Sequence, residues 1–313
     1  MRELVCIELP KGGRVSLYRS GVIMMSNRRS ESSSIQLVTS ICLSVLLALS
    51  AYAAGNELDP ASSAALDLAI NGEHRSPENK ARDKYRHPKE TLAFFGFRSD
   101  MTVVEIWPGG GWYTEILAAA LKDSGTLYAA QYSVNPAYAY QRRYFGAFLT
   151  KAGSTPDVYR DVIITAFDFP YELDIAPRGA ADLVLTFRNA HNWVSPGYPK
   201  ISAQLAFSAM YDALKPGGIL GIVDHRWPDA ENEDPGSEDG YISEERLIAL
   251  ATDAGFEFAG RTDVNRNPKD THNHPEGVWT LPPSLALGDK NRDRYVAIGE
   301  SDRLTIKFVK PTI

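Results

Sequence analysis

Short apolar runs rich in β-branched residues alternate along the chain with segments whose apolar residues have helical spacing. Thr102 to Ile106 is one such run, and Ile116, Leu117 and Leu121 then share one face of a predicted helix over Thr114 to Leu121. Further strands are predicted at 126–131, 162–165, 181–187, 219–224, 256–260 and 304–309, and further helices at 137–150, 201–214 and 243–254. This alternation predicts an α/β fold built on a doubly wound, mostly parallel sheet.

Three segments precede or interrupt this pattern. Residues 54–100 are predicted to form a helical lead-in to a main domain over 101–313, with arginines at 75, 82 and 86 that form either a solvated face or a lid. Residues 227–240 are acidic and rich in turn formers, and residues 263–294 are polar with several prolines. Loop insertions of such length usually shape or cover a site.

The N-terminal 53 residues have the order of a secretory signal peptide. Arg28 and Arg29 precede an apolar run over 35–49, and Ala51-Tyr52-Ala53 follows it as a cleavage pattern. We therefore expect an exported, periplasmic protein that loses residues 1–53 and has no stable membrane insertion afterwards. Without cleavage, the same run would be a membrane anchor.

A glycine-rich turn stands at the carboxyl end of the first predicted strand. Residues 105–111 read EIWPGGG and lead directly into the helix at 114–121. Glycines in such a turn let a ligand approach the backbone, and the free N–H groups of a helix N-terminus favour polar or anionic ligands. Glu105 can accept hydrogen bonds from such a ligand, so the turn predicts a nucleotide-cofactor loop.

Three blocks of sequence together resemble the class I S-adenosylmethionine-dependent methyltransferases. They are the EIWPGGG loop, the strand DLVLTF at 182–187 and the helix-to-strand turn ALKPGGIL at 213–220. The resemblance covers residues 102–309 and is closest to an exported bacterial subgroup known only as predicted methyltransferases. It implies a Rossmann-like sheet of seven strands with an antiparallel last strand, S-adenosyl-L-methionine as cofactor, and methylation of an O or N atom of a small-molecule or protein acceptor.

The resemblance also implies which residues hold the cofactor. Glu105, Gly109 and Gly111 would hold its methionine end and ribose, Gln131 its ribose hydroxyls and Asp168 its adenine amine. The other predicted cofactor residues are Trp107, Pro108, Gly110 and Arg188. The chain departs from the family at Trp107, where a glycine is usual, and at Gln131, where an acid is usual. Weaker cofactor binding is therefore expected.

Polar side chains follow the strands at 181–187 and 219–224, where the family places groups that face the transferred methyl. His191 is the candidate base, because an imidazole titrates near neutral pH. The alternative is a loop histidine that only holds its own turn. Asp224, His225 and Arg226 form a second candidate group, either in contact with the substrate or as a structural network, and Asp224 is placed to orient either histidine.

Charge and cysteine content exclude two classes of function. The 33 basic and 39 acidic residues become 27 and 36 once residues 1–53 are removed, and so acidic a surface argues against binding of nucleic acid. Both cysteines, Cys6 and Cys42, lie in the removed segment. Methylation of pyrimidine C5 through a cysteine adduct is therefore excluded.

One loop cluster has residue types that bind divalent ions. Asp270, His272, His274 and Glu276 lie in a proline-flanked segment, but no second anchored group of ligands occurs at a recognisable spacing. We therefore predict no metal site there.

Two rival functions stay open. A nicotinamide-dependent oxidoreductase would use a similar loop, although Thr114 stands where its third glycine would be and Gln131 where its ribose-binding acid would be. A non-catalytic ligand-binding protein on the same fold is the other rival, because a fold does not determine a function.

Overall fold

The computed structural model describes residues 5–9, 13–17 and 57–312, and the chain divides into two units, Met1–Ala54 and Gly55–Ile313. In the first unit, strands β1 (Val5–Leu9) and β2 (Gly13–Leu17) form an antiparallel pair that the sequence pattern did not predict. The signal-like elements of the predicted signal peptide, residues 27–53, lie outside the described residues. Within the described ranges, no helix is both long and apolar enough to cross a bilayer.

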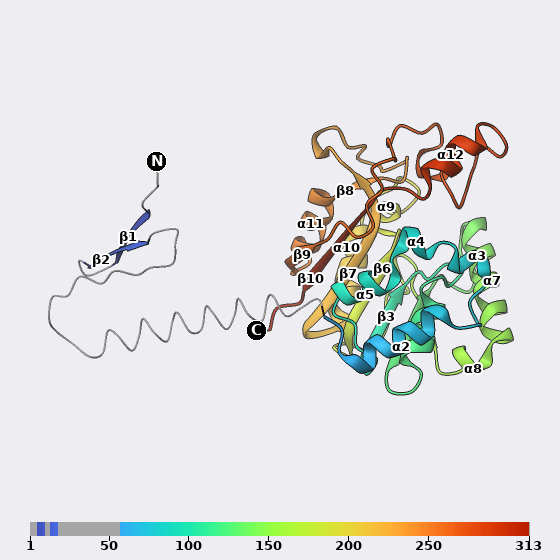
Figure 1. The fold of residues 1–313 in the computed structure, drawn as a ribbon, viewed down its shortest axis with the longest axis horizontal. Coiled ribbons are helices and arrows are strands. Elements are labelled where there is room, and N and C mark those ends of the chain that lie inside the picture. The colour runs from blue at the N-terminus through green and yellow to red at the C-terminus, as the bar shows by residue number, and fades with distance from the viewer. Residues whose placement is uncertain (1–4, 10–12, 18–56, 313) are drawn as a thin grey trace. The chain divides into compact units, whose positions relative to one another are not determined.

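The second unit is built on one mixed sheet (Figure 1). Its strands are β3 (Thr102–Ile106), β4 (Thr126–Gln131), β5 (Ile163–Ala166), β6 (Ala181–Phe187), β7 (Leu214–Trp227), β8 (Ile242–Ser243), β9 (Glu257–Arg261) and β10 (Arg303–Val309). The order is β5-β4-β3-β6-β7-β10-β9, and the two-residue β8 pairs with the end of β7. Only β10 runs antiparallel to its neighbours. The predicted fold class is therefore confirmed, with β8 as an additional eighth strand.

Helices cover both faces of the sheet (Figure 1). They are α2 (Pro60–Asn71), α3 (Pro77–Lys80), α4 (Asp83–Arg86), α5 (Pro88–Phe94), α6 (Thr114–Leu121), α7 (Ala139–Ser154), α8 (Pro156–Tyr159), α9 (Ala190–Trp193), α10 (Ser202–Ala213), α11 (Glu244–Asp253) and α12 (Arg292–Ile298), with 3₁₀ turns at Ala230–Asn232 and Gly277–Thr280. Side chains of β3 alternate between two apolar clusters. Val103 packs with α2, α5 and α6, whereas Val104 and Ile106 pack with α7, α10 and α11.

Local sequence explains where several helices begin. The Asp59 carboxylate accepts hydrogen bonds from the N–H groups of Ala61 and Ser62, with Pro60 at the first helical position of α2. The Ser243 hydroxyl likewise accepts from the N–H of Arg246 at the start of α11. These caps satisfy N–H groups that have no partner inside the helix.

The predicted boundaries of β3, α6, β4 and β6 agree with the structure residue for residue. The prediction of 219–224 was too short at both ends of β7, which begins at Leu214 and extends beyond Asp224 through His225 and Arg226 to Trp227. This polar end carries no strand pattern of its own. It is extended because His225 pairs with Arg303 on β10 and Arg226 pairs with Ile242 on β8.

The lead-in helices pack closely on the sheet at Gly221 of β7. A Cβ atom added there would lie 2.7 Å from the Phe95 ring and 2.8 Å from a methyl group of Leu185. Phe95, at the end of α5, therefore rests on the strand backbone itself, and glycine is the residue that permits this contact.

We expect Gly221→Ala to destabilise the protein by about 1–3 kcal/mol, because the extra methyl overfills a close-packed core. In Gly146→Ala the new methyl, on helix α7, meets nothing within 4 Å. That control should be more stable than wild type by about 0.5–1 kcal/mol, as alanine favours a helix over glycine. Urea unfolding of the two variants checks this, and equal stabilities would contradict the packing described here.

Candidate functional site

The carboxyl ends of β3 and β6 meet where the strand order reverses. β4 lies on one side of β3 and β6 on the other, so the connections diverge from this point. In open α/β sheets, ligands bind in the crevice outside such a reversal. The structure brings most of the predicted site residues to this edge of the sheet, at the strand ends 105–111, 131, 188–191 and 224–226.

The side chain of Trp107 occupies this crevice. The residue has a positive φ of 44°, as the usual glycine would permit, and its indole is only 3% exposed. Its ring centroid lies 5.2 Å from that of Tyr132, 5.8 Å from Phe167, 6.0 Å from Trp193 and 5.7 Å from Tyr198. The indole N–H donates to the Phe167 carbonyl oxygen at 2.7 Å. The space between the strand ends is thus filled by protein.

Gln131 is also committed to internal contacts. Its fully buried amide donates to the Gly109 carbonyl oxygen at 3.0 Å and accepts from the N–H of Tyr132 at 3.0 Å. These bonds tie the end of β4 to the glycine loop. One N–H and one oxygen lone pair of the amide remain, but the side chain is fully buried and does not face solvent.

Glu105 is buried beneath the same loop. The Thr114 hydroxyl donates to its carboxylate at 2.6 Å, and burial raises the pKa of Glu105 to about 8. At neutral pH the side chain is therefore largely a neutral acid. It lacks the charge that would strengthen its hydrogen bonds to a bound cofactor.

These observations decide whether the crevice fits S-adenosylmethionine. Trp107 fills the space, while Gln131 and Glu105 are engaged within the protein. Gly111 is explained within the protein by its positive φ of 76° and by packing, since a Cβ atom there would lie 3.0 Å from the ring of Phe148 on α7. Asp168 is partly exposed, and its carboxylate accepts from the N–H of Phe169 at 2.9 Å. The residues present do not fit the cofactor, and a nicotinamide dinucleotide would meet the same obstruction.

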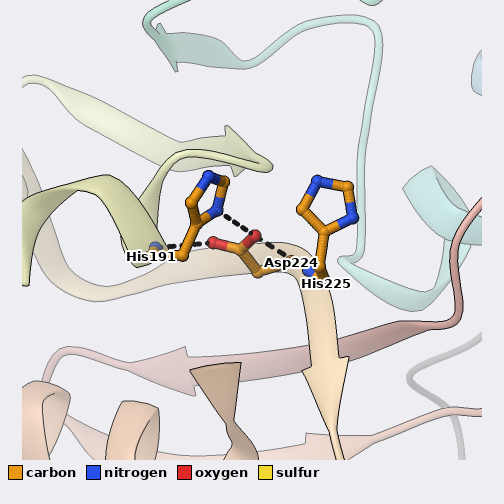
Figure 2. Close-up of side chains that lie close together, drawn as sticks. All are labelled: His191, Asp224 and His225. Carbon is orange, nitrogen blue, oxygen red and sulfur yellow. Dashed lines mark hydrogen bonds and ion pairs between the residues drawn. The ribbon is translucent and has the colours of Figure 1, made fainter. Parts of the chain in front are cut away.

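A second group of side chains lies at the ends of β6 and β7. Figure 2 shows His191 and His225 on either side of Asp224. Nδ1 of His191 is 2.8 Å from one oxygen of the Asp224 carboxylate, and the backbone N–H of His191 donates to the other at 3.1 Å. The backbone N–H of His225 donates to Asp224 at 2.8 Å. Among the described residues, Nε2 of His191 has no hydrogen-bond partner.

His225 is a neutral imidazole in this environment. Burial holds its pKa well below the ordinary value, and the nearby His191, Arg303 and Arg188 lower it further. Its Nδ1 is hydrogen-bonded to the hydroxyl of Ser301. The two imidazole centroids are 5.3 Å apart, so His225 belongs to the surroundings of His191.

Arg226 serves a different purpose. Its guanidinium lies 3.2 Å from the carboxylate of Asp263, 3.5 Å from Asp302 and 3.9 Å from Glu244. These contacts join the end of β7 to the 263–294 segment and to α11. These contacts are those expected of an arginine in a structural network, and whether Arg226 also contacts a substrate stays a prediction.

His191, Asp224 and His225 offer ligand atoms within 4.8 Å of one another, which is close enough to hold a metal ion. Both Asp224 oxygens already accept hydrogen bonds, however, and Nδ1 of His225 is bonded to Ser301. A metal ion would have to replace several of these bonds, so the observed arrangement fits an oriented imidazole better.

The Asp270 loop is organised by hydrogen bonds instead. The Asp270 carboxylate accepts from the Tyr241 hydroxyl at 3.0 Å, from the backbone N–H groups of His272 and Asp302, and is paired with Nε2 of His274 at 2.8 Å. Glu276 is exposed and takes no part. A buried acid with this many partners anchors its loop.

Sequence reasoning missed Trp279 and Ser301, which approach the histidines from distant segments. The Trp279 ring centroid lies 6.3 Å from that of His191, and this tryptophan is 40% exposed. Neither residue belongs to a motif, so no local signal could have identified them.

No protein-family model and no curated protein matches the chain. Among solved structures, an S-adenosylmethionine-dependent methyltransferase from Aquifex aeolicus is similar at a TM-score of 0.47 and 15% identity, over 81% of this chain and 100% of that one. The cyclase SpnF is similar at 0.49 and 16%, over 82% and 99%. Fibrillarin from Aeropyrum pernix, solved with S-adenosyl-L-methionine bound, is similar at 0.41 and 12%, over 70% and 73%. The fold class of this chain is given by its own strand order.

The raised pKa of Glu105 predicts a pH dependence of stability. The folded protein keeps this proton up to about pH 8, whereas the unfolded chain releases it near 4.5. Stability should therefore fall as pH rises from 4.5 to 8, by up to about 1.4 kcal/mol per pH unit. Glu105→Gln keeps the neutral form and should lose less stability over this window. Urea unfolding at several pH values, with exposed Glu257→Gln as control, checks this, and parallel curves for all three proteins would contradict it.

The packing of Trp107 predicts that the full-length chain does not bind S-adenosylmethionine. We expect no heat of binding in calorimetric titration, and none with NADH. Trp107→Ala should lose about 3–5 kcal/mol of stability, because the ring fills a closed space. Micromolar binding of S-adenosylmethionine to the wild-type protein would show that the crevice opens.

Proposed function

We propose that this chain is an enzyme in which His191 exchanges a proton with a bound small molecule. The observation that carries the proposal is the bond between Nδ1 of His191 and the buried Asp224 carboxylate, together with the free Nε2 of the same ring. This arrangement supports a base whose tautomer and orientation are held by an acid behind it.

Asp224 supports this role in two ways. It accepts Nδ1–H, which leaves the lone pair on Nε2, and it stabilises the imidazolium that forms when Nε2 takes a proton. Its bonds to the backbone N–H groups of His191 and His225 fix the carboxylate between the two strand ends. A base positioned in this way contributes about 10²–10⁴-fold to a reaction rate.

Methyl transfer is the second candidate function, favoured by the strand order and by the EIWPGGG loop. Methylation of an O–H or N–H group on a small-molecule or protein acceptor needs a proton acceptor, which is the role proposed here for His191. The packing of Trp107 argues against S-adenosylmethionine as the cofactor. No step of the first proposal therefore involves it.

Export is also a proposal, based on the signal-like residues 27–53. S-adenosylmethionine is made in the cytoplasm, so a periplasmic enzyme that uses it would need an outside supply. Proton-transfer chemistry that depends only on residues of this chain has no such requirement.

The tautomer of His191 tests the proposal directly. In full-length protein labelled with ¹⁵N-histidine, we expect the neutral form of the His191 ring to be the tautomer with Nδ1 protonated and Nε2 unprotonated. His74 is an internal control of the opposite kind, because its Nε2 lies 2.9 Å from the carbonyl oxygen of Glu115 and must donate to it. A protonated Nε2 on neutral His191 would exclude it as a base.

Loss of His191 should also remove turnover. We would incubate the full-length protein with a panel of carboxylated and phosphorylated small molecules, with and without S-adenosylmethionine, and follow conversion by mass spectrometry. His191→Gln and Asp224→Asn should lower any conversion by about 100-fold or more, whereas His74→Gln, outside the cluster, should not. Conversion that requires S-adenosylmethionine would favour the second candidate, and binding without conversion would favour a ligand-binding protein.

A further inference from the structure

Three arginines share one buried carboxylate beside the candidate site. Nε of Arg82 lies 2.6 Å and Nε of Arg86 3.0 Å from the oxygens of Glu300, and Arg303 also pairs with this carboxylate. Arg82 and Arg86 come from the lead-in helices, whereas Arg303 opens β10. All these pairs are largely removed from water, where unbalanced charge is most costly.

Arg188 adds a fourth positive charge. It follows β6 with a positive φ of 63°, and within residues 57–312 its guanidinium has no hydrogen bond or ion pair. Burial, together with repulsion by Arg303, lowers the pKa of Arg188 to about 10, although Glu300 partly offsets these effects. Arg188 thus combines a backbone conformation that is unfavourable for a non-glycine residue with a guanidinium that has no partner among the described residues.

The cluster has fewer acceptors than its donors require. Glu300 is the only carboxylate that contacts any of the four arginines in the described part of the chain. Nη2 of Arg82, Nη2 of Arg86 and Nε of Arg303 are buried without a hydrogen-bond partner. A buried donor without an acceptor costs about 1–3 kcal/mol, and more when it is charged. The four arginines therefore carry more positive charge and more donors than the one carboxylate of Glu300 can balance.

The cluster adjoins the two histidines. Arg303 pairs with His225 across β10 and β7, and both Arg303 and Arg188 contribute to the lowered pKa of His225. Arg188 remains partly exposed and the Arg82 side chain is 23% exposed, so these two residues are reached from solvent.

We propose that Arg188, with Arg82, Arg86 and Arg303, binds the oxyanion group of a small molecule, either a phosphate or a carboxylate. Guanidinium groups match the geometry of both oxyanions and bond to them in pairs of parallel hydrogen bonds. The anion supplies the charge and the acceptors that Glu300 alone does not. That the rest of the molecule then reaches His191 rests on the proposed function, but binding of the anion does not.

Thermal unfolding and calorimetry of the full-length protein test this, with inorganic phosphate, acetate and chloride compared at constant ionic strength. We expect phosphate or acetate to raise the unfolding temperature, and chloride not to do so. The anion with the larger effect identifies which of the two chemistries the site prefers. Arg188→Gln should weaken binding about tenfold or more. Arg160→Gln is the matched control, because Arg160 is an exposed arginine whose one ion pair within the described ranges is with Asp157.

The stability of Arg188→Gln in the absence of a bound oxyanion gives a second test. Removing a repelled cation should leave Arg188→Gln as stable as wild type or more stable in chloride, whereas an arginine with only a structural role would destabilise the fold when lost. Arg188→Lys, which keeps the charge but not the paired donors, should bind with intermediate affinity. His191→Gln should bind phosphate normally, so failure of the catalytic proposal would leave this one intact. Equal responses of wild type and Arg188→Gln to all three anions would overturn it.

Discussion

The packing of one indole ring holds together the carboxyl edge of the sheet. Trp107 follows β3, and its aromatic partners follow β4, β5 and β6, so one side chain links the end of β3 to the ends of three other strands. The hydrogen bond from the indole to the Phe167 carbonyl fixes the ring within this group. Because the crevice at the strand reversal is filled, the polar chemistry of the edge lies beside it, at the ends of β6 and β7.

Buried charges at this edge differ in how well they are compensated. Asp224 has three hydrogen-bond partners, whereas the Glu105 side chain has only the Thr114 hydroxyl among the described residues, and burial raises the pKa of Glu105. The arginines around Glu300 have the opposite imbalance, with more donors than acceptors. Where each buried charged group has enough hydrogen-bond partners, as around His191, the side chains keep a fixed orientation. Where donors outnumber acceptors, as around Glu300, the site can accept another charged group.

Local sequence patterns were sufficient to predict several helices and strands, but not the side-chain contacts between them. The boundaries of β3, α6, β4 and β6 could be predicted because each has an apolar pattern and a glycine or polar residue at its end. The proximity of His191 to Asp224 could be anticipated, because both follow neighbouring parallel strands. Their roles, like those of the other candidate residues, stay predictions. The Glu300 arginines could not be grouped, because more than 200 residues separate Arg82 and Arg86 from Glu300. For Trp107, sequence identified the unusual residue but not its five distant ring partners.

The position of Trp107 also bears on how any molecule could use the crevice. The indole behaves as a ligand covalently attached to its own binding site, and it is present at an effective concentration that no diffusing molecule easily matches. A compound that enters must bind the small fraction of chains in which the ring has left, so its apparent affinity is lowered in proportion to that fraction. The apparent affinity of any ligand for this crevice would then depend more on the fraction of molecules in which the Trp107 ring has left than on the contacts that the ligand makes.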